Sequence, residues 1–286
     1  FLGKKLLNQQ LGFLAAFLFA ISFAQTQYAF YFGNPAPAIL TILLFYLGWA
    51  LLIFQKQPWG WVLIGLNLGL SIQFEFFLIY LFASVVLLLI FFRREIKKSF
   101  RLKHFLFGLL SFLFAVSNFL LAEVKFNFKT TKTLLGLIFH HQEGGVKLAT
   151  STFTERLGQE VLYNLFGFWP KAREFLAILI VFSLIFYFIR KSEFRKQIIF
   201  LTIWLGSNLF LDVFGPPQLY YVGIGLSAGL ILFAAFLLLE VFKFKKVMFF
   251  FCLAVIILSN LLLIFKQNPK GSIKELYVQE GMMLKD

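Results

Sequence analysis

Long apolar runs, separated by short polar or basic turns, dominate this 286-residue chain. A helix that crosses a bilayer needs about 20 mostly apolar residues, because lipid offers no hydrogen-bond partner to a bare backbone. The sequence therefore predicts an all-α polytopic membrane protein with about nine transmembrane helices. The expected spans are residues 11–26, 37–54, 59–74, 76–92, 104–122, 174–190, 197–213, 218–241 and 247–265.

The composition excludes several other classes of protein. Hydrophobic residues make up 60% of the chain and charged residues 14%, which is too apolar for a soluble globular domain. The net charge of +14 would suit nucleic acid, but the cations stand in short turns between apolar runs, where they set membrane topology. We therefore expect membrane lipid and no nucleic acid as a partner. The single cysteine, Cys252, excludes a disulfide framework and a thiolate metal site.

Residues 59–92 form an almost uninterrupted apolar run, in which Glu75 is the single charged residue. As a single helix it would measure about 50 Å, whereas the hydrocarbon core of a bilayer is about 30 Å thick. We expect a hairpin of two short helices that turns near Glu75.

Lysine and arginine collect in alternate turns, which predicts a cytoplasmic N-terminus for the first span. The opposite short turns, at 27–36, around Glu75 and at 214–217, hold no cation. A long loop, 123–173, and the C-terminal tail then lie on the outer side. The residues expected inside are Lys4, Lys5, Lys56, Arg93, Arg94, Lys97, Lys98, Arg101, Lys103, Arg190, Lys191, Arg195, Lys196, Lys243, Lys245 and Lys246.

Two segments are expected: a transmembrane helical domain over 1–265, which includes the outer loop 123–173, and the start of an outer tail over 266–286. Because the chain begins with Phe1 and an apparent helix end, it is interpreted as a fragment of a longer protein.

Ionisable and aromatic residues at the expected outer ends of the spans are the candidates for substrate binding. A charge within or beside a span is costly and usually has a reason. Each candidate also has a simpler explanation: a turn residue for Glu75, a solvated helix end for Asp212 and Glu123, and an interfacial ring for the tyrosines. The candidates are Glu75, Glu123, Lys125, Asp212, Gln218, Tyr220 and Tyr221.

His140, His141 and Glu143 are residue types that suit divalent transition metals. Adjacent histidines diverge by about 100° on a helix, so a surface loop is favoured over a metal site. The sequence predicts no particular cofactor, and it is compatible with binding of a divalent cation.

Several segments together resemble a known family. They are 2–7 (LGKKLL), 11–22 (LGFLAAFLFAIS), 63–70 (LIGLNLGL) with 71–76 (SIQFEF), and 218–225 (QLYYVGIG). In this order they resemble the basic turn, small-residue-rich helix, Gly-spaced hairpin and Tyr-containing helix entry of bacterial glycosyltransferases with the GT-C fold. This group includes the family 39 protein mannosyltransferases and the aminoarabinose lipid A transferases.

The resemblance implies that the outer loop 27–37 faces the lipid-linked sugar, which adds Tyr31 and Asn34 to the substrate-binding candidates. The arginine usual in that loop is not evident here. The resemblance also places the acidic catalytic residue in an outer loop upstream of Phe1, so the catalytic residue is expected outside this chain.

The predicted function is therefore transfer of a hexose or pentose from a polyprenyl-phosphate-linked sugar to a lipid, glycan or protein of the cell envelope. The resemblance places the protein in a bacterial-type cytoplasmic membrane. A transporter, a flippase or a polysaccharide polymerase is the alternative. The sequence contains no nucleotide-binding Gly-rich loop, zinc-protease helix or nucleophile elbow, which suits a lipid-phosphate donor.

Overall fold

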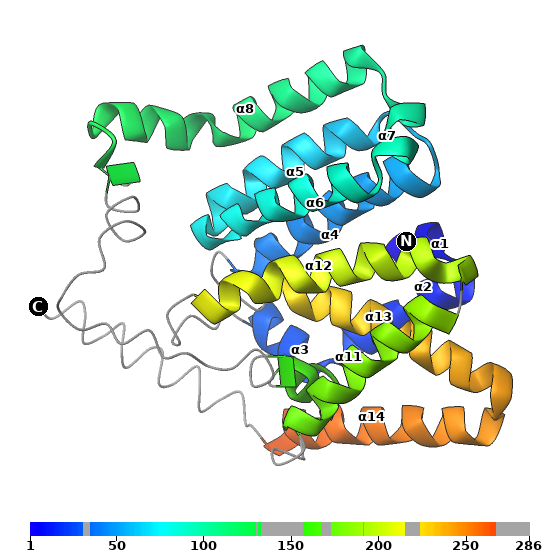
Figure 1. Cartoon of the computed structure of the whole chain (residues 1–286). Helices are drawn as coiled ribbons and strands as arrows, with labels where there is room; N and C mark the ends of the chain where they lie inside the picture. The colour runs from blue at the N-terminus through cyan, green and yellow to red at the C-terminus, as the bar shows by residue number, and fades with distance from the viewer. Residues whose placement is uncertain are drawn as a thin grey trace, which may run out of the picture.

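The computed structural model describes residues 1–30, 35–129, 131–132, 157–158, 160–166, 173–190, 192–214 and 224–266, and it is helical throughout these ranges, apart from short turns. The helices are α1 (Leu2–Leu6), α2 (Gln9–Ile21), α3 (Phe23–Phe30), α4 (Pro35–Phe54), α5 (Gly60–Phe74), η1 (Phe76–Tyr80), α6 (Leu81–Phe91), α7 (Arg93–Ser99), α8 (Leu102–Lys125), the π-helical η2 (Leu162–Phe166), α11 (Arg173–Arg190), η4 (Ser192–Phe194), α12 (Arg195–Phe214), α13 (Ile224–Phe244) and α14 (Lys246–Lys266). Most of the longer helices lie side by side in one bundle (Figure 1).

Each expected span overlaps a helix or a pair of helices, which confirms an all-α fold. Within the described residues, four helices are long and apolar enough to cross a membrane by themselves: Ala36–Phe54, Leu102–Lys125, Gly225–Phe244 and Lys246–Lys266. A fifth candidate is the pair Phe175–Ile189 and Ser192–Ser207, which is bent by 105°. The count of nine spans stays a prediction, because α2, α5 and α6 are shorter than a bilayer requires.

The basic turns gather at one end of the bundle, where Figure 1 places α1, α7 and the turn between α13 and α14. We call this the basic end. Polar contacts hold its segments together: the Gln55 and Gln197 side-chain amides donate to the backbone oxygens of Lys5 and Leu6, each over 3.3 Å. This arrangement fits the predicted alternation of the cations.

Glycines bring α5 very close to both of its neighbours, α4 and α8. A Cβ on Gly48 would lie 2.8 Å from the Gly60 oxygen, and one on Gly69 would lie 2.7 Å from the Ala115 Cβ. Gly65 and Gly108 approach so closely that a Cβ on Gly65 would overlap the Gly108 carbonyl. Small residues at these positions allow backbones to pack directly, as is common between helices in lipid.

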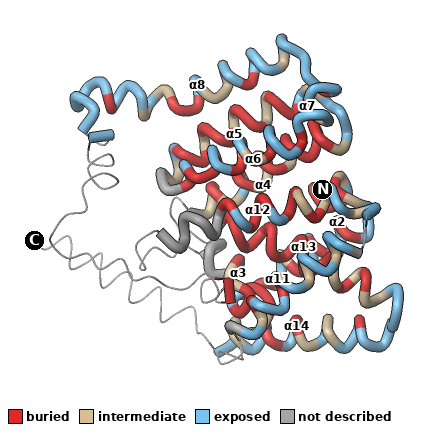
Figure 2. The backbone as a smooth tube through the Cα atoms, in the orientation of Figure 1, coloured by how far each residue is buried: buried red, intermediate tan, exposed pale blue. Residues whose placement is uncertain are grey.

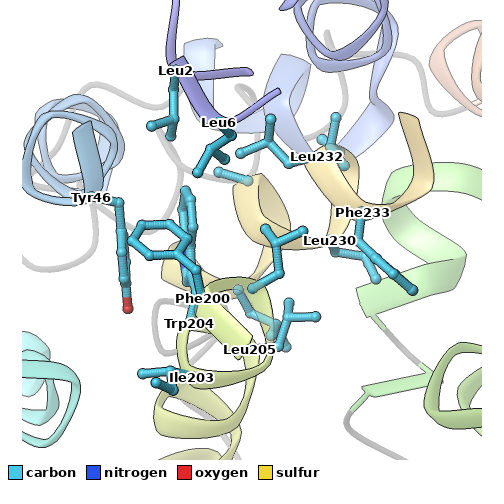
Figure 3. Packing of buried hydrophobic residues seen from close by; sticks show 14 of the residues in the cluster. Leu2, Leu6, Tyr46, Phe200, Ile203, Trp204, Leu205, Leu230, Leu232 and Phe233 are labelled. Carbon is cyan, nitrogen blue, oxygen red and sulfur yellow. The ribbon is translucent and has the colours of Figure 1, made fainter. Parts of the chain in front are cut away.

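The centre of the bundle is aromatic and fully buried (Figures 2 and 3). Tyr46 of α4 stacks on Trp204 of α12, with ring centroids 3.8 Å apart, and Phe200 packs edge-on against both rings. The Trp204 indole donates to the Gly225 carbonyl over 2.7 Å, and the Tyr46 hydroxyl shares a 2.8 Å hydrogen bond with Ser84. This cluster joins α4, α6, α12 and α13.

The first expected span, 11–26, is not one continuous helix. It breaks at Ser22, whose backbone is extended, so that α2 ends at Ile21 and α3 begins at Phe23. The break frees backbone groups that need partners inside the protein. The Phe23 N–H finds one in the side chain of Asn260, 237 residues later, at 2.7 Å.

Candidate functional site

Glu75 lies at the predicted hairpin turn, between the end of α5 and the start of η1. Its backbone is extended there, with φ −140° and ψ 107°. Its N–H donates to the Ser71 carbonyl and its own carbonyl accepts from Leu78 N–H, each over 2.9 Å. The predicted turn at Glu75 is therefore confirmed, and the position of the residue is fixed by the backbone on both sides.

The Glu75 side chain is half-buried and its carboxylate makes no hydrogen bond or ion pair with any part of the chain that the structure describes. Burial raises the pKa of this carboxyl above its ordinary value. One turn earlier, Ser71 shares a 2.7 Å hydrogen bond with Thr41, which attaches this end of α5 to α4. Glu75 is thus held in place by its backbone, and its carboxylate, which is unpaired among the described residues, can accept a hydrogen bond from a hydroxyl group or pair with a cation.

Glu123 and Lys125 lie in the last turn of α8, as expected, but their side chains have different roles. Glu123 is 4% exposed, and its carboxylate accepts from the backbone N–H and the hydroxyl of Thr131 at 3.0 and 2.8 Å. It therefore fixes the turn that follows α8. Lys125 is exposed, with its ammonium group 5.5 Å from the centre of the Phe126 ring, and remains accessible to a phosphate.

The structure does not place the side chains of the other candidates relative to Glu75 and Lys125. Asp212 lies in the last turn of α12, and its side chain is not among those that the structure describes. No group of three or more His, Cys, Asp or Glu side chains with the geometry of a metal site occurs among the described residues. The remaining candidates lie outside the described ranges: Tyr31, Asn34, His140, His141, Glu143, Gln218, Tyr220 and Tyr221.

A buried group of uncharged polar side chains was not predicted from the sequence. We call it the polar junction, and it consists of Ser22, Gln25, Asn164, Ser227 and Asn260, all at most 7% exposed. The Asn164 side-chain oxygen accepts from the Ser22 hydroxyl at 2.9 Å and from the Gln25 amide at 3.4 Å. The same Gln25 amide donates to the Ser227 hydroxyl at 2.9 Å.

The polar junction attaches part of the predicted outer loop to the helical bundle. Asn164 belongs to η2, and its partners Ser22 and Gln25 lie at the break between α2 and α3 and in α3. Gln25 in turn connects this group to Ser227 of α13.

Asn260 of α14 completes the set by donating to the carbonyls of Asn164 and Leu165, each at 3.4 Å. The Asn164 side-chain amide also donates to the backbone carbonyl and to the carboxylate of Glu160, at 2.9 and 3.3 Å, so one ionisable side chain borders the junction. The five junction side chains themselves are uncharged, and they position the segments that they join.

A sequence signal for this junction did exist. Ser22, Gln25 and Asn260 are isolated polar residues within or at the edge of apolar runs, where a side chain needs a buried partner. Pairing them required knowledge of which helices meet. The end of α5 that precedes Glu75 and the helix α3, which carries Gln25, both lie away from the basic end (Figure 1).

Comparison with known proteins supports one family. Residues 1–121 match the model of the family described as dolichyl-phosphate-mannose-protein mannosyltransferase. The match runs from α1 through most of α8 and includes Glu75 and the glycine contacts of α5. It confirms the resemblance to GT-C glycosyltransferases over this part of the chain. Searches of curated proteins and of solved structures gave no significant match.

Proposed function

From the family match over residues 1–121, we propose that the protein takes part in the transfer of a sugar from a polyprenyl-phosphate donor to an acceptor in the cell envelope, on the outer face of the membrane. The match is the observation that carries this proposal. The apolar helical bundle supports it, because a polyprenyl chain needs an apolar surface along which to lie.

Glu75 is proposed to bind a hydroxyl group of the sugar or of the acceptor. A carboxylate that is fixed by its backbone and has no protein partner costs free energy unless a ligand pairs with it. Its burial strengthens a hydrogen bond from a ligand, because fewer water molecules compete for the oxygens. The proposed role is binding and orientation, and no proton transfer is assigned to Glu75.

Lys125 is the proposed partner of the donor phosphate among the described candidates. It is exposed at the end of α8, and an ammonium group lowers the energy of the negative charge that grows on a leaving phosphate. Tyr31, Asn34, Asp212, Gln218, Tyr220 and Tyr221 are proposed to line the same outer site. Glu123 is dropped from this set as a ligand, since Thr131 occupies its carboxylate.

The test is sugar transfer by the full-length protein in membrane vesicles, with polyprenyl phosphate that carries radiolabelled mannose as the donor. Glu75→Gln keeps the shape of the side chain and removes its charge. We expect at least about a tenfold loss of transfer, since a hydrogen bond to a charged group contributes about 1.5–3 kcal/mol. Gln73→Ala, at an exposed position two residues earlier, is the matched control and should transfer normally.

Three results would count against these proposals, and each has a different meaning. Normal transfer by Glu75→Gln removes Glu75 from the site but leaves the transferase intact. The protein is a transporter or flippase if it moves the lipid-linked sugar across the vesicle membrane but releases no polyprenyl phosphate, whichever labelled sugar the donor carries. A product that grows by repeated units identifies a polymerase.

A further inference from the structure

An open hollow lies at the basic end, where α6 passes into α7. Its volume is about 590 Å³, and the described residues that line it are Leu89, Ile90, Phe91 and Arg93. The three apolar side chains are 38–60% exposed, so they form an accessible wall rather than part of the core. Arg93 ends this wall with a cation. An apolar surface that leads to a cation matches a ligand with a hydrocarbon chain and an anionic group.

The helix that follows extends the cationic part of this surface. In α7, the four side chains Arg93, Arg94, Lys97 and Lys98 are all exposed. Residues four apart share one face of a helix, so Arg93 lies near Lys97 and Arg94 near Lys98. Ile96 is buried on the other side and anchors the helix. The cations are therefore held together on a fixed, outward-facing surface.

Glu95, the one acid between Arg93 and Lys103 in the sequence, does not neutralise this surface. Its carboxylate binds Lys196 of α12 over 2.6 Å. Partial burial pushes the pKa of Glu95 up, but the hydrogen bond and charge of Lys196, with help from Lys98, bring it below its ordinary value. No acidic side chain among the described residues forms an ion pair with Arg93 or Arg94.

We propose that this hollow and the exposed face of α7 bind an anionic glycerophospholipid. One acyl chain lies against Leu89, Ile90 and Phe91, and the phosphate is bound by Arg93, which lines the hollow, while Arg94 adds positive charge beside it. Arginine suits this role because its planar guanidinium group can donate two parallel hydrogen bonds to phosphate oxygens. A zwitterionic lipid fits less well, because its own cation would face Lys97 and Lys98.

The proposal differs from binding of the sugar donor. The donor headgroup is proposed to lie near Glu75, at the opposite end of the bundle from α7 (Figure 1). The lipid site also stands if the proposed transferase activity is wrong, because it rests on the hollow and on the exposed cations alone.

The experiment is native mass spectrometry of the full-length protein in a mild detergent, with added phosphatidylglycerol or phosphatidylcholine. We expect phosphatidylglycerol to be retained about tenfold better, since each cation near a lipid surface contributes about 1 kcal/mol, a factor of about five. The double variant Arg93→Gln/Arg94→Gln should reduce phosphatidylglycerol binding at least about fivefold. Lys245→Gln/Lys246→Gln removes two exposed cations at the same end of the bundle and should change binding less than about twofold.

A second variant tests the acyl-chain part without changing the charge. Ile90→Ser shortens a 60% exposed side chain in the wall of the hollow and should weaken phosphatidylglycerol binding about threefold, as expected for lost apolar contact. It also gives an answer if the arginine variant does not fold.

Four results would overturn the proposal. An equal loss of phosphatidylglycerol binding in the two double variants would mean that only net charge matters. Equal retention of phosphatidylglycerol and phosphatidylcholine would mean that the headgroup is not recognised. Displacement of the lipid by free glycerol 3-phosphate would identify a site for soluble phosphate. Displacement by an equal amount of polyprenyl phosphate would identify a donor-lipid site instead.

Discussion

The two helices α8 and α14 form opposite edges of the bundle, and both are mostly exposed, but they are attached by different chemistry (Figures 1 and 2). α8 packs mainly on α5, through glycines that bring the two backbones into direct contact. α14 packs on α13 and is also tied to η2 and α3 by the side chain of Asn260. One edge therefore depends on shape, and the other depends on buried hydrogen bonds.

Close packing at α8 and buried hydrogen bonds at α14 are two ways in which helices associate where water is absent. Lipid tails are as apolar as leucine, so burying apolar surface gives little attraction between helices in a membrane. Close van der Waals contact and hydrogen bonds remain, and each edge relies chiefly on one of them. The two edges should therefore respond to different substitutions, whereas a surface ion pair that belongs to neither edge should contribute least.

Gly65→Ala should damage the α8 edge most. The new Cβ would overlap the Gly108 carbonyl, and because that atom belongs to the backbone, the helices must separate. We expect a loss of about 3 kcal/mol in the free energy of unfolding, or failure to fold. The thermal unfolding midpoint in detergent measures it.

Gly206→Ala is the matched control, because a Cβ there meets no atom within 4 Å. It should be neutral or stabilising by up to about 1 kcal/mol, since alanine favours a helix. Equal destabilisation by the two substitutions would show that helix flexibility, and not close packing, is what glycine supplies to α5.

Asn260→Leu should weaken the α14 edge by about 1–3 kcal/mol, because the replacement keeps the volume but leaves the buried Phe23 N–H without its acceptor. Unfolding in detergent measures this loss as well. Limited proteolysis between α8 and α11 should also become faster, since Asn260 helps to hold η2.

Ser111→Ala on α8 is the control for this prediction. Ser111 donates only to the Phe107 carbonyl of its own helix, at 2.7 Å, so its loss should cost less than about 0.5 kcal/mol. If Asn260→Leu is as mild as this control, the polar junction does not stabilise the α14 edge.

Glu95→Gln should have the smallest effect, because the Lys196 side chain is 60% exposed and water screens the pair. We expect a loss of about 0.5 kcal/mol, which 1 M salt should reduce. The folded-state pKa of Glu95 is lowered, so this contribution is complete above the ordinary carboxyl value of 4.5 and is lost as the pH falls through the lowered folded value. A variant whose stability follows the same pH curve as the unmodified protein would refute this role.

The sequence predicts much of this fold for reasons that can be stated locally. Among the described residues, apolar length locates the longer helices, and the single charge at Glu75 locates the hairpin turn. Gly65 and Gly69 stand out as a spaced pair, although only the structure shows that they face α8. The break at Ser22 is not evident from the local sequence, because the side chain that accepts the freed Phe23 N–H, Asn260, is far away in the chain.

The candidate site was less predictable. Glu75 was identified because a lone charge in an apolar run is unusual, and no side chain in the described ranges pairs with its carboxylate. Glu123 was a candidate because it stands at the end of an apolar run, close to Lys125. Thr131 binds it, and a sequence does not distinguish a satisfied carboxylate from a free one. Asn164 carried no signal of its own, because an asparagine in a polar loop is ordinary until helices close around it.

The unequal lengths of α5 and α8 have a consequence for the membrane itself. Fifteen residues of α5 rise about 22 Å, whereas the 24 residues of α8 rise about 36 Å. Contacts of Gly65 with Gly108 and of Gly69 with Ala115 fix the two helices beside each other, with more of α8 than of α5 remaining beyond them. α8 therefore extends past the end of α5. A bilayer that matches α8 is too thick for α5, so lipid beside α5 must thin or give way to water. Such a depression would bring a lipid headgroup down to the depth of Glu75.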